Sequence, residues 1–183
     1  MDIRFLSGNK FKIIEANKIL NNIGVNIVPI NIKIDEIQTE DPIKLLKDNS
    51  LKAFEILGRP LFVEHTGLYL NYLNELPGGL TQIFWDRLEA DKFCDLFGKT
   101  TDTSAVARTL IGYVNGKKIQ IFDGEIKGNI SVEPRGNRDF QWDCVFIPEG
   151  YSQTFAELGE EKNEISMRRR ALDKFATFLK GVE

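Results

Sequence analysis

The spacing of hydrophobic and polar positions changes repeatedly along the chain, and each change predicts a new element. Residues 3–6 are typical of a short strand, which ends at Ser7-Gly8-Asn9. Apolar side chains then recur at helical spacing at Ile13, Ala16, Leu20 and Ile23. The β-branched run over residues 25–34 predicts a second strand. The chain thus opens as strand, helix and strand.

A second helix is expected to start at Asp41-Pro42, because an N-cap residue followed by proline is a common helix beginning. Its apolar positions predict that Ile43, Leu46, Ala53 and Leu57 face inward, with Asp48 and Lys52 on a polar face. Residues 61–63 are typical of a buried strand, which we expect to end where the polar motif at residues 64–67 begins. A turn at residues 76–79 and a helix through Phe97 follow.

The second half of the chain has the pattern of a strand meander closed by a helix. Residues 105–114 and 117–122 flank Asn115-Gly116, which predicts a β-hairpin on a type I′ turn. Short extended segments are expected up to Pro148. Ser166 can cap a last helix that buries Ala171, Phe175 and Leu179 and ends before Gly181. The order of elements predicts a single α/β domain over residues 1–183, with helices packed on a mixed sheet.

Composition narrows the possible functions. The 183 residues include 42% hydrophobic and 28% charged side chains, which is ordinary globular composition. The net charge of −3 argues against a nucleic-acid surface, and no apolar run is long enough to span a membrane. Two distant cysteines and a single histidine do not suggest structural zinc. We expect a cytoplasmic protein that has neither nucleic-acid nor membrane partners.

One candidate phosphate site lies where the first strand gives way to the first helix. Ser7, Gly8 and Asn9 precede Lys10 and Lys12 there. Free N–H groups at a helix start favour an anion, and a nearby lysine adds positive charge. A capped helix with solvated lysines explains the same residues, so both interpretations stay open. The Walker and dinucleotide patterns do not fit.

Two acidic residues beside strand ends, Glu36 and Glu64, are candidate metal ligands. Mg²⁺ prefers oxygen ligands and is usually held by one or two carboxylates together with substrate phosphates. By spacing alone, solvated surface carboxylates are the better interpretation.

Eight motifs in order resemble the inosine triphosphate pyrophosphatase family over nearly the whole chain. The first half contains Ser7-Gly8-Asn9 with Lys12 and Glu15, Asp35-Glu36, Asn49 with Lys52, Glu64-His65-Thr66-Gly67-Leu68 and Leu76-Pro77-Gly78-Gly79. The second half contains Phe122-Asp123-Gly124, Phe140-Gln141-Trp142-Asp143 and the segment from Thr154 to Arg168 with Lys162-Asn163 and Ser166-Met167-Arg168. Each motif alone is weak, but their number and order make the resemblance specific.

The resemblance implies a two-lobed α/β fold with a mixed sheet and a central cleft, usually as a homodimer. It also implies Mg²⁺-dependent hydrolysis of non-canonical purine nucleoside triphosphates (ITP, dITP or XTP) to the monophosphate and pyrophosphate. Ser7, Gly8, Asn9, Lys10, Lys12, Lys52 and Thr66 would hold the triphosphate, and Glu36 and Glu64 the metal. Phe140 would stack on the base, and Trp142, Asp143, Lys162, Met167 and Arg168 would surround the base and sugar. Base stacking on an aromatic ring is worth about 1–3 kcal/mol.

This sequence departs from the family pattern at several positions. His65 replaces the second acid of the E-D-S/T-G-L motif, and Met167 replaces the histidine of S-H-R. Leu80, Gln82, Gln141 and Cys144 also differ from the usual residues of their motifs. Three interpretations follow: a pyrophosphatase with altered base preference or metal chemistry, a catalytically weak or inactive nucleotide-sensing protein, and a relative whose cleft is unused. The retained charged residues argue against the third.

The histidine predicts an altered metal requirement. An imidazole nitrogen is a poor ligand for Mg²⁺ but a good one for Mn²⁺ or Co²⁺, so those ions are expected to support more turnover. With a reference pKa near 6.5, His65 could also act as a general base beside Glu64. A lone histidine is, however, more often a hydrogen-bonded structural residue.

Overall fold

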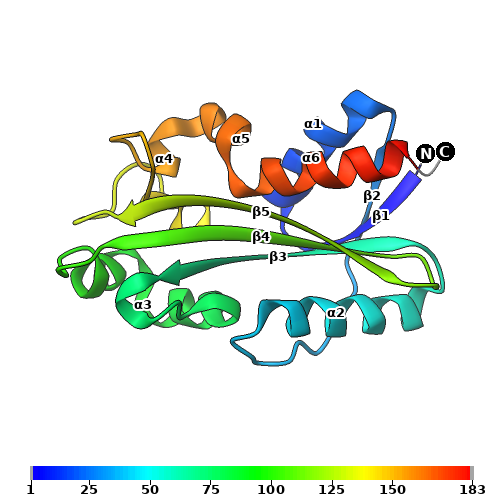
Figure 1. Cartoon of the computed structure of the whole chain (residues 1–183), viewed down its shortest axis with the longest axis horizontal. Helices are drawn as coiled ribbons and strands as arrows, with labels where there is room; N and C mark the ends of the chain where they lie inside the picture. Colours follow the sequence, from blue (N-terminus) through cyan, green and yellow to red (C-terminus); the bar gives the residue numbers. More distant parts are fainter. Residues whose placement is uncertain (1, 182–183) are drawn as a thin grey trace.

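Six strands form one mixed sheet in the computed structural model, which describes residues 2–181 (Figure 1). The strands are β1 (Asp2–Leu6), β2 (Asn26–Ile30), β3 (Leu61–Leu70), β4 (Ser104–Val114), β5 (Ile119–Ile130) and β6 (Phe146–Pro148). Their order is β2-β1-β3-β4-β5-β6. Strands β1, β2 and β3 are parallel, whereas β3 to β6 pair antiparallel. The expected α/β mixed sheet is confirmed.

Two strand boundaries differ from the sequence-based expectation. Strand β3 does not end at the polar motif but continues to Leu70, paired with β4 throughout. The polar residues interrupt its hydrophobic pattern without interrupting its backbone pairing. Strand β2 ends early, at Ile30. It is an edge strand that contains Pro29, a residue without an N–H group to donate.

The hairpin between β4 and β5 is confirmed, but its predicted type I′ turn is wrong. Val114 pairs with Ile119, so the loop has four residues, 115–118. Gly116 has a positive φ of 88°, and Asn115 does not. The Asn115 side chain instead accepts hydrogen bonds from the backbone N–H groups of Lys117 and Lys118, which fixes the wider loop.

The main helices are α1 (Lys10–Leu20), α2 (Pro42–Leu57), α3 (Thr81–Phe97) and α6 (Met167–Lys180). Asp41 caps α2 and Ser166 caps α6, both as expected. Ala171, Phe175 and Leu179 of α6 are buried. In α2, Leu46 and Ala53 are buried as expected, and Leu57 is half-buried. The expectation for Ile43 is wrong: its side chain is 46% exposed, because the first turn of α2 lies at the rim of a surface hollow.

Short helices connect these elements. They are η1 (Asn21–Ile23), η2 (Asn71–Leu73), η3 (Gly78–Leu80), η4 (Gln141–Cys144), α4 (Phe155–Leu158), η5 (Gly159–Glu161) and α5 (Lys162–Ile165). The sequence pattern did not resolve α4 or α5. Among residues 2–181, no helix has the length and hydrophobicity needed to cross a bilayer.

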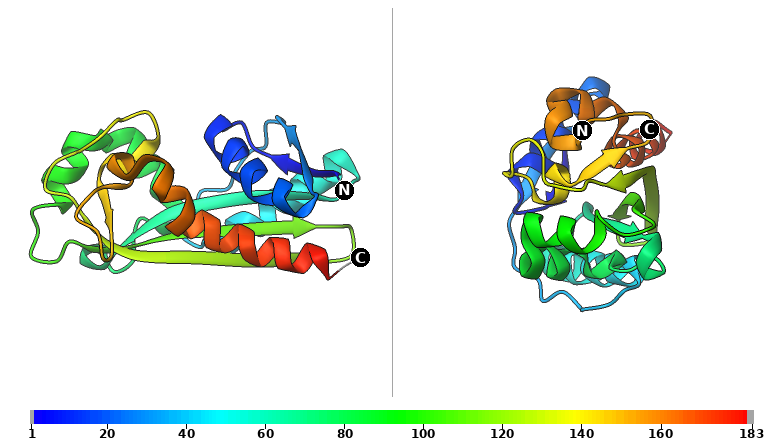
Figure 2. Two further views of the ribbon diagram at one scale, coloured as in Figure 1. Left: turned by 90° about the horizontal axis from the view of Figure 1, so that it is seen from above. Right: turned by 90° about the vertical axis from the view of Figure 1, so that its left-hand side faces the viewer.

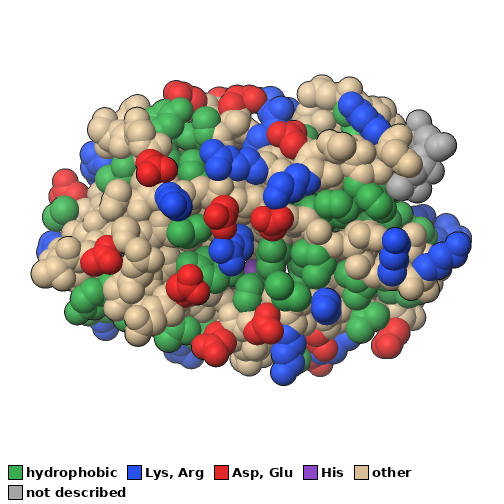
Figure 3. All heavy atoms as spheres, in the orientation of Figure 1, with side chains coloured by type: hydrophobic (Ala, Val, Ile, Leu, Met, Phe, Trp, Pro, Cys, Tyr) green, Lys and Arg blue, Asp and Glu red, His purple; other side chains and the backbone are tan. Residues whose placement is uncertain are grey.

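The helices divide between the two faces of the sheet, and the hydrophobic residues pack into separate clusters along it. Helices α2 and α3 cover one face, and α1 and α6 lie on the other (Figure 1). One lobe has a core that includes Phe93, Trp142, Phe146 and Phe155, and the other packs around Phe5, Phe62 and Phe175. Viewed from above, α3 and the α4 segment lie at one end of the long strands, and α1 and β1 lie toward the other end, so the molecule has two lobes (Figure 2). Acidic and basic side chains are interspersed over the visible surface (Figure 3).

Candidate active site

The turn after β1 is built by its own side chains. Ser7 Oγ accepts a hydrogen bond from the Asn9 N–H (3.2 Å). Asn9 is the N-cap of α1, and its Oδ1 accepts from the N–H groups of Phe11 (3.0 Å) and Lys12 (3.3 Å). The capped-helix interpretation therefore describes the turn in this structure. A phosphate that uses these N–H groups must compete with the Asn9 side chain.

A buried charge cluster joins α1, β3 and α6 beside this turn. The Glu64 side chain is fully buried and receives Lys12 Nζ at 3.1 Å and Arg168 Nε at 3.0 Å. Thr66 Oγ1 donates a third hydrogen bond to Glu64 (2.9 Å). The Arg168 guanidinium also pairs with Glu15. Residues separated by more than 150 positions in the sequence thus share one ion-pair network.

The network keeps Glu64 ionised. Burial raises the pKa of this carboxyl, but the positive charges of Arg168 and Lys12 outweigh it and lower the pKa to about 2. Glu64 is therefore a permanent anion at neutral pH, with its oxygens directed at two cations.

The next residue, His65, lines a polar hollow of about 360 Å³ together with Glu64 and Lys12. The imidazole hydrogen-bonds the Gly78 backbone, and its Nε2 atom is buried without a hydrogen-bond partner among the described residues. Burial and the Lys12 charge lower the pKa of His65 to about 4. The pKa of His65 therefore lies below the reference value near 6.5. The ring is neutral at physiological pH, which preserves its nitrogen lone pair as a ligand but makes it a weaker base.

A second hollow, of about 220 Å³, lies beside Phe140 and is lined by aromatic and charged side chains. Lys162 Nζ lies 4.3 Å and Arg168 Cζ 5.5 Å from the centre of the Phe140 ring. The Phe11 ring meets Phe140 edge-on at 5.3 Å. Lys162 also forms a buried ion pair with Asp143 (2.5 Å). Burial raises the pKa of Asp143, although Lys162 opposes this shift.

These two hollows lie on either side of the charge cluster, and comparison with known proteins identifies the fold that carries them. The Ham1 family model matches residues 3–178. The chain belongs to the Ham1 family. A dITP/XTP pyrophosphatase from Methanopyrus kandleri is 35% identical, with 99% of this chain and 97% of the relative covered. An inosine triphosphate pyrophosphatase from Yarrowia lipolytica is 36% identical over 98% of this chain and 96% of that protein.

Solved Ham1 structures share the architecture. A HAM1 protein from Coxiella burnetii superposes with a TM-score of 0.85 at 25% identity, covering 99% of both chains. The Staphylococcus aureus Ham1 protein gives a TM-score of 0.81 at 22% identity over the full length of both chains, which supports the fold alone. The expected fold family is confirmed.

Two residues expected to touch the ligand are buried in this structure, and a third is engaged by protein groups. Trp142 and Met167 are buried in the hydrophobic core of one lobe, where Trp142 packs against Phe146 and Phe155. Lys52 Nζ bonds the Asp35 carbonyl (2.6 Å) and the Asp48 carboxylate (2.7 Å). Lys52 therefore anchors the segment that carries Glu36, and its role toward the triphosphate stays a prediction.

The donor set of the larger hollow fits a divalent ion that keeps solvent and phosphate ligands. Glu36, Glu64 and Asp86 all border it. No group of three His, Cys, Asp or Glu side chains within residues 2–181 is close enough to enclose an ion without other ligands. Mg²⁺ sites of the kind that use one or two carboxylates plus substrate phosphates match this arrangement.

Several lining residues were not among the sequence-based candidates. Asp86 and Gln82 come from α3, and Gln82 Oε1 accepts a hydrogen bond from Gln141 Nε2 (2.6 Å). Phe11, next to the N-terminal motif, is 37% exposed and borders the aromatic hollow. A phenylalanine beside the polar turn, out of step with the apolar positions Ile13, Ala16 and Leu20, was the signal available in the sequence. Gln82 was noted in the sequence only as a departure from its motif, and nothing in the local pattern around Asp86 places it opposite β3.

Proposed function

We propose that this Ham1 protein hydrolyses non-canonical purine nucleoside triphosphates (ITP, dITP or XTP) to the monophosphate and pyrophosphate. The observation that carries the proposal is Glu64, held between Lys12 and Arg168 at the junction of a polar and an aromatic hollow. The Methanopyrus kandleri and Yarrowia lipolytica relatives have names that state such activities. Residues 1–183 would act as one catalytic domain.

In this proposal, the polar hollow receives the triphosphate. The Lys12 ammonium leaves Glu64 and forms an ion pair with a phosphate oxygen instead. The turn at Ser7, Gly8, Asn9 and Lys10 lies beside it. Thr66 hydrogen-bonds the carboxylate that is released. Preorganised positive charge at this position stabilises the negative charge that develops on the phosphates.

Glu36 and Glu64 would hold a divalent metal ion, with His65 beside them. A bound ion would polarise the phosphoanhydride and orient the attacking water. The neutral His65 ring can accept a hydrogen bond through Nε2 and so position that water, but its low pKa limits it as a base. We propose Mg²⁺ as the ion, with Mn²⁺ or Co²⁺ more effective because of the imidazole.

The aromatic hollow would receive the base. Phe140 offers a ring for stacking, and the Lys162–Asp143 pair and Arg168 supply polar groups at its edge.

The second candidate function, nucleotide sensing without turnover, is favoured by the replacement of an acid at position 65.

A panel of ITP, XTP, dITP, ATP and GTP tests these alternatives, with pyrophosphate, orthophosphate and binding measured in parallel. Pyrophosphate release from the deaminated substrates supports the enzyme. Tight binding without product identifies a sensor, and orthophosphate as the first product contradicts the proposed bond cleavage.

We also propose a homodimer, which sedimentation at equilibrium would test by a mass of about twice 20.9 kDa.

A further inference from the structure

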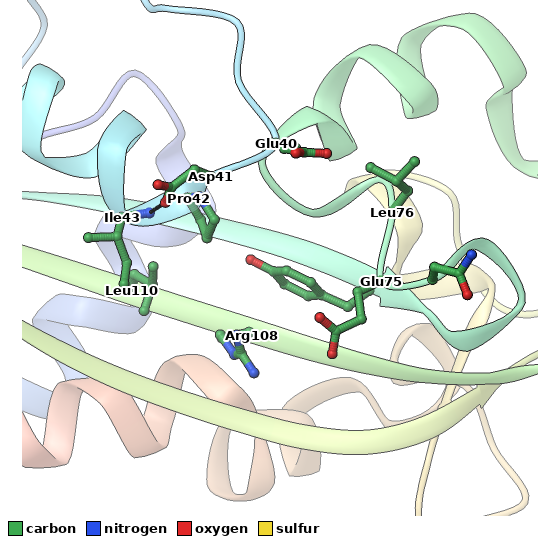
Figure 4. Close-up of a pocket in the computed structure, with 10 residues that line it drawn as sticks. Glu40, Asp41, Pro42, Ile43, Glu75, Leu76, Arg108 and Leu110 are labelled. Carbon is green, nitrogen blue, oxygen red and sulfur yellow. Dashed lines mark hydrogen bonds between the residues drawn. The ribbon is translucent and has the colours of Figure 1, made fainter.

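A hollow outside the proposed active site has the features of a second ligand site. It has a volume of about 380 Å³ and lies between the start of α2, the 74–76 turn and the central strands (Figure 4). Its lining combines acidic, aromatic and apolar side chains: Glu40, Asp41, Ile43, Tyr69, Glu75 and Leu76. None of these residues borders the two hollows assigned to the nucleotide.

The Tyr69 hydroxyl is a buried group at this hollow that lacks a hydrogen-bond partner among the described residues. Tyr69 is only 8% exposed, and its Oη atom is buried without a hydrogen-bond partner among residues 2–181. Leaving a buried hydroxyl unpaired is unfavourable, so such groups usually meet a partner in the functional state. Burial raises the pKa of Tyr69 to about 12, so the neutral hydroxyl can donate and accept.

The charges around the hollow select a cation. Asp41 and Glu75 lie on opposite sides of it, and Glu40 lies at its rim (Figure 4). Arg108 is the one basic residue in the lining, and it is already engaged. Its guanidinium stacks on the Tyr69 ring (4.9 Å) and pairs with Glu125 (2.9 Å). Phosphates and carboxylates would therefore meet repulsion here.

The lining also indicates what kind of cation fits. No three acidic, histidine or cysteine side chains in the described chain converge closely enough to hold a metal ion. Ile43 and Leu76, by contrast, offer apolar surface beside the carboxylates. An alkyl chain can cover that surface while an ammonium group at its end meets carboxylates, as lysine side chains do on proteins.

We propose that this hollow binds a small alkylammonium compound, with Tyr69 Oη, Asp41 and Glu75 meeting ammonium groups and Ile43 and Leu76 covering the alkyl chain. Asp41 keeps its role as the α2 cap through Oδ1, which accepts from the Ile43 and Lys44 N–H groups. The remaining carboxylate oxygen is available to the ligand.

Calorimetry on the full chain without nucleotide tests the site, with 1,5-diaminopentane as the probe and pentanoate as a matched anion. We expect one diamine per chain and no pentanoate binding. Tyr69→Phe should weaken diamine binding about three- to tenfold, the effect of one hydrogen bond. Glu75→Gln should weaken it at least as much, whereas Glu55→Gln, an exposed α2 carboxylate away from the hollow, should leave it unchanged.

Thermal unfolding provides a readout that separates folding from binding. Because the hydroxyl is unpaired in the free chain, Tyr69→Phe should leave the melting temperature unchanged or raise it. Diamine binding that is absent, equal in all variants or matched by pentanoate would overturn the proposal. So would a dimer that Ile43→Asp dissociates while no diamine binds, because a second copy would then cover the hollow. None of these outcomes bears on pyrophosphate release.

Discussion

Among the lysines near the N-terminal turn, Lys12 is the one whose ammonium faces the proposed phosphate site. Among the described residues it forms an ion pair with Glu64 alone, whereas Lys52 contacts Asp48 and the Asp35 carbonyl. Lys12→Ala should weaken triphosphate binding by about 1.5–3 kcal/mol, the value of a charge-assisted hydrogen bond. Calorimetry with a non-hydrolysable ITP analogue measures this. The control is Lys18→Ala, an exposed α1 lysine paired with Glu160. Equal affinities for both variants would remove Lys12 from the site.

The residue at position 65 is expected to determine the metal requirement. His65→Asp restores a hard oxygen ligand, so Mg²⁺-dependent pyrophosphate release should rise at least about tenfold, and the advantage of Mn²⁺ or Co²⁺ should shrink. Initial rates with each ion in wild type and variant provide the comparison. If wild type runs fast on Mg²⁺ and the substitution changes nothing, His65 has only a packing role.

The lowered pKa of His65 also predicts a pH dependence of stability. The pKa of His65 is 6.5 in the unfolded chain and about 4 in the folded protein. Between these two pH values, the unfolded chain binds a proton at His65 that the folded protein does not bind. The contribution of His65 to the free energy of unfolding should therefore be complete above pH 6.5. It should fall by on the order of 3 kcal/mol as the pH is lowered toward 4. His65→Asn should lack this component. Urea titrations at several pH values measure it, and parallel curves for both proteins would contradict the shift.

The replacement at position 65 was visible in the sequence, but its consequence was not. The pKa depends on the Gly78 backbone, on Lys12 and on burial, and these come from three separate segments. In the same way, the sequence pointed to Met167 and Trp142 as ligand contacts because of their motifs. Only the packing of α6 and η4 shows that both side chains point into a core.

At the level of elements, α6 positions Arg168 by packing against β5 at Gly124. A Cβ on Gly124 would lie 2.1 Å from the Met167 carbonyl and 2.6 Å from the Ala171 nitrogen, and neither backbone atom can move alone. Gly124→Ala should therefore reduce the free energy of unfolding by about 1–3 kcal/mol and lower activity by displacing Arg168. Gly181→Ala, after the same helix, meets no atom closer than 3.6 Å and serves as the control. Urea denaturation of both variants tests this; equal stability would contradict the tight α6–β5 contact.

The capped and amphipathic helices were predictable because their signals are local. Asp41-Pro42 and Ser166 mark starts that the structure confirms. Strand β3 was predicted too short because its pairing with β4 depends on residues about 40 positions away, which no local pattern reports. The four-residue hairpin loop was missed for a similar reason: Asn115-Gly116 fits two turn types, and strand register decides between them.

At the level of the whole molecule, base selectivity should be low. Met167 is buried, and the Arg168 guanidinium is already paired with Glu64 and Glu15, so few free donors face the aromatic hollow. Strong discrimination requires buried polar groups that only one base satisfies. We expect kcat/KM for ITP to exceed that for ATP by less than about a hundredfold, or roughly 2.8 kcal/mol. Steady-state kinetics with both nucleotides measure the ratio, and a larger preference would show that another group reads the base.

The long central strands have a mechanical consequence. Strand β3 pairs with β4 over ten residues and β4 with β5 over eleven, and these ladders run through both lobes. Bending one lobe toward the other would break many of these backbone hydrogen bonds together. The sheet should therefore resist hinge bending between the lobes. Segments 31–41 and 131–141 also border the cleft, but they contain no strand and take no part in these ladders. We therefore expect the long strands to keep their shape when a nucleotide binds.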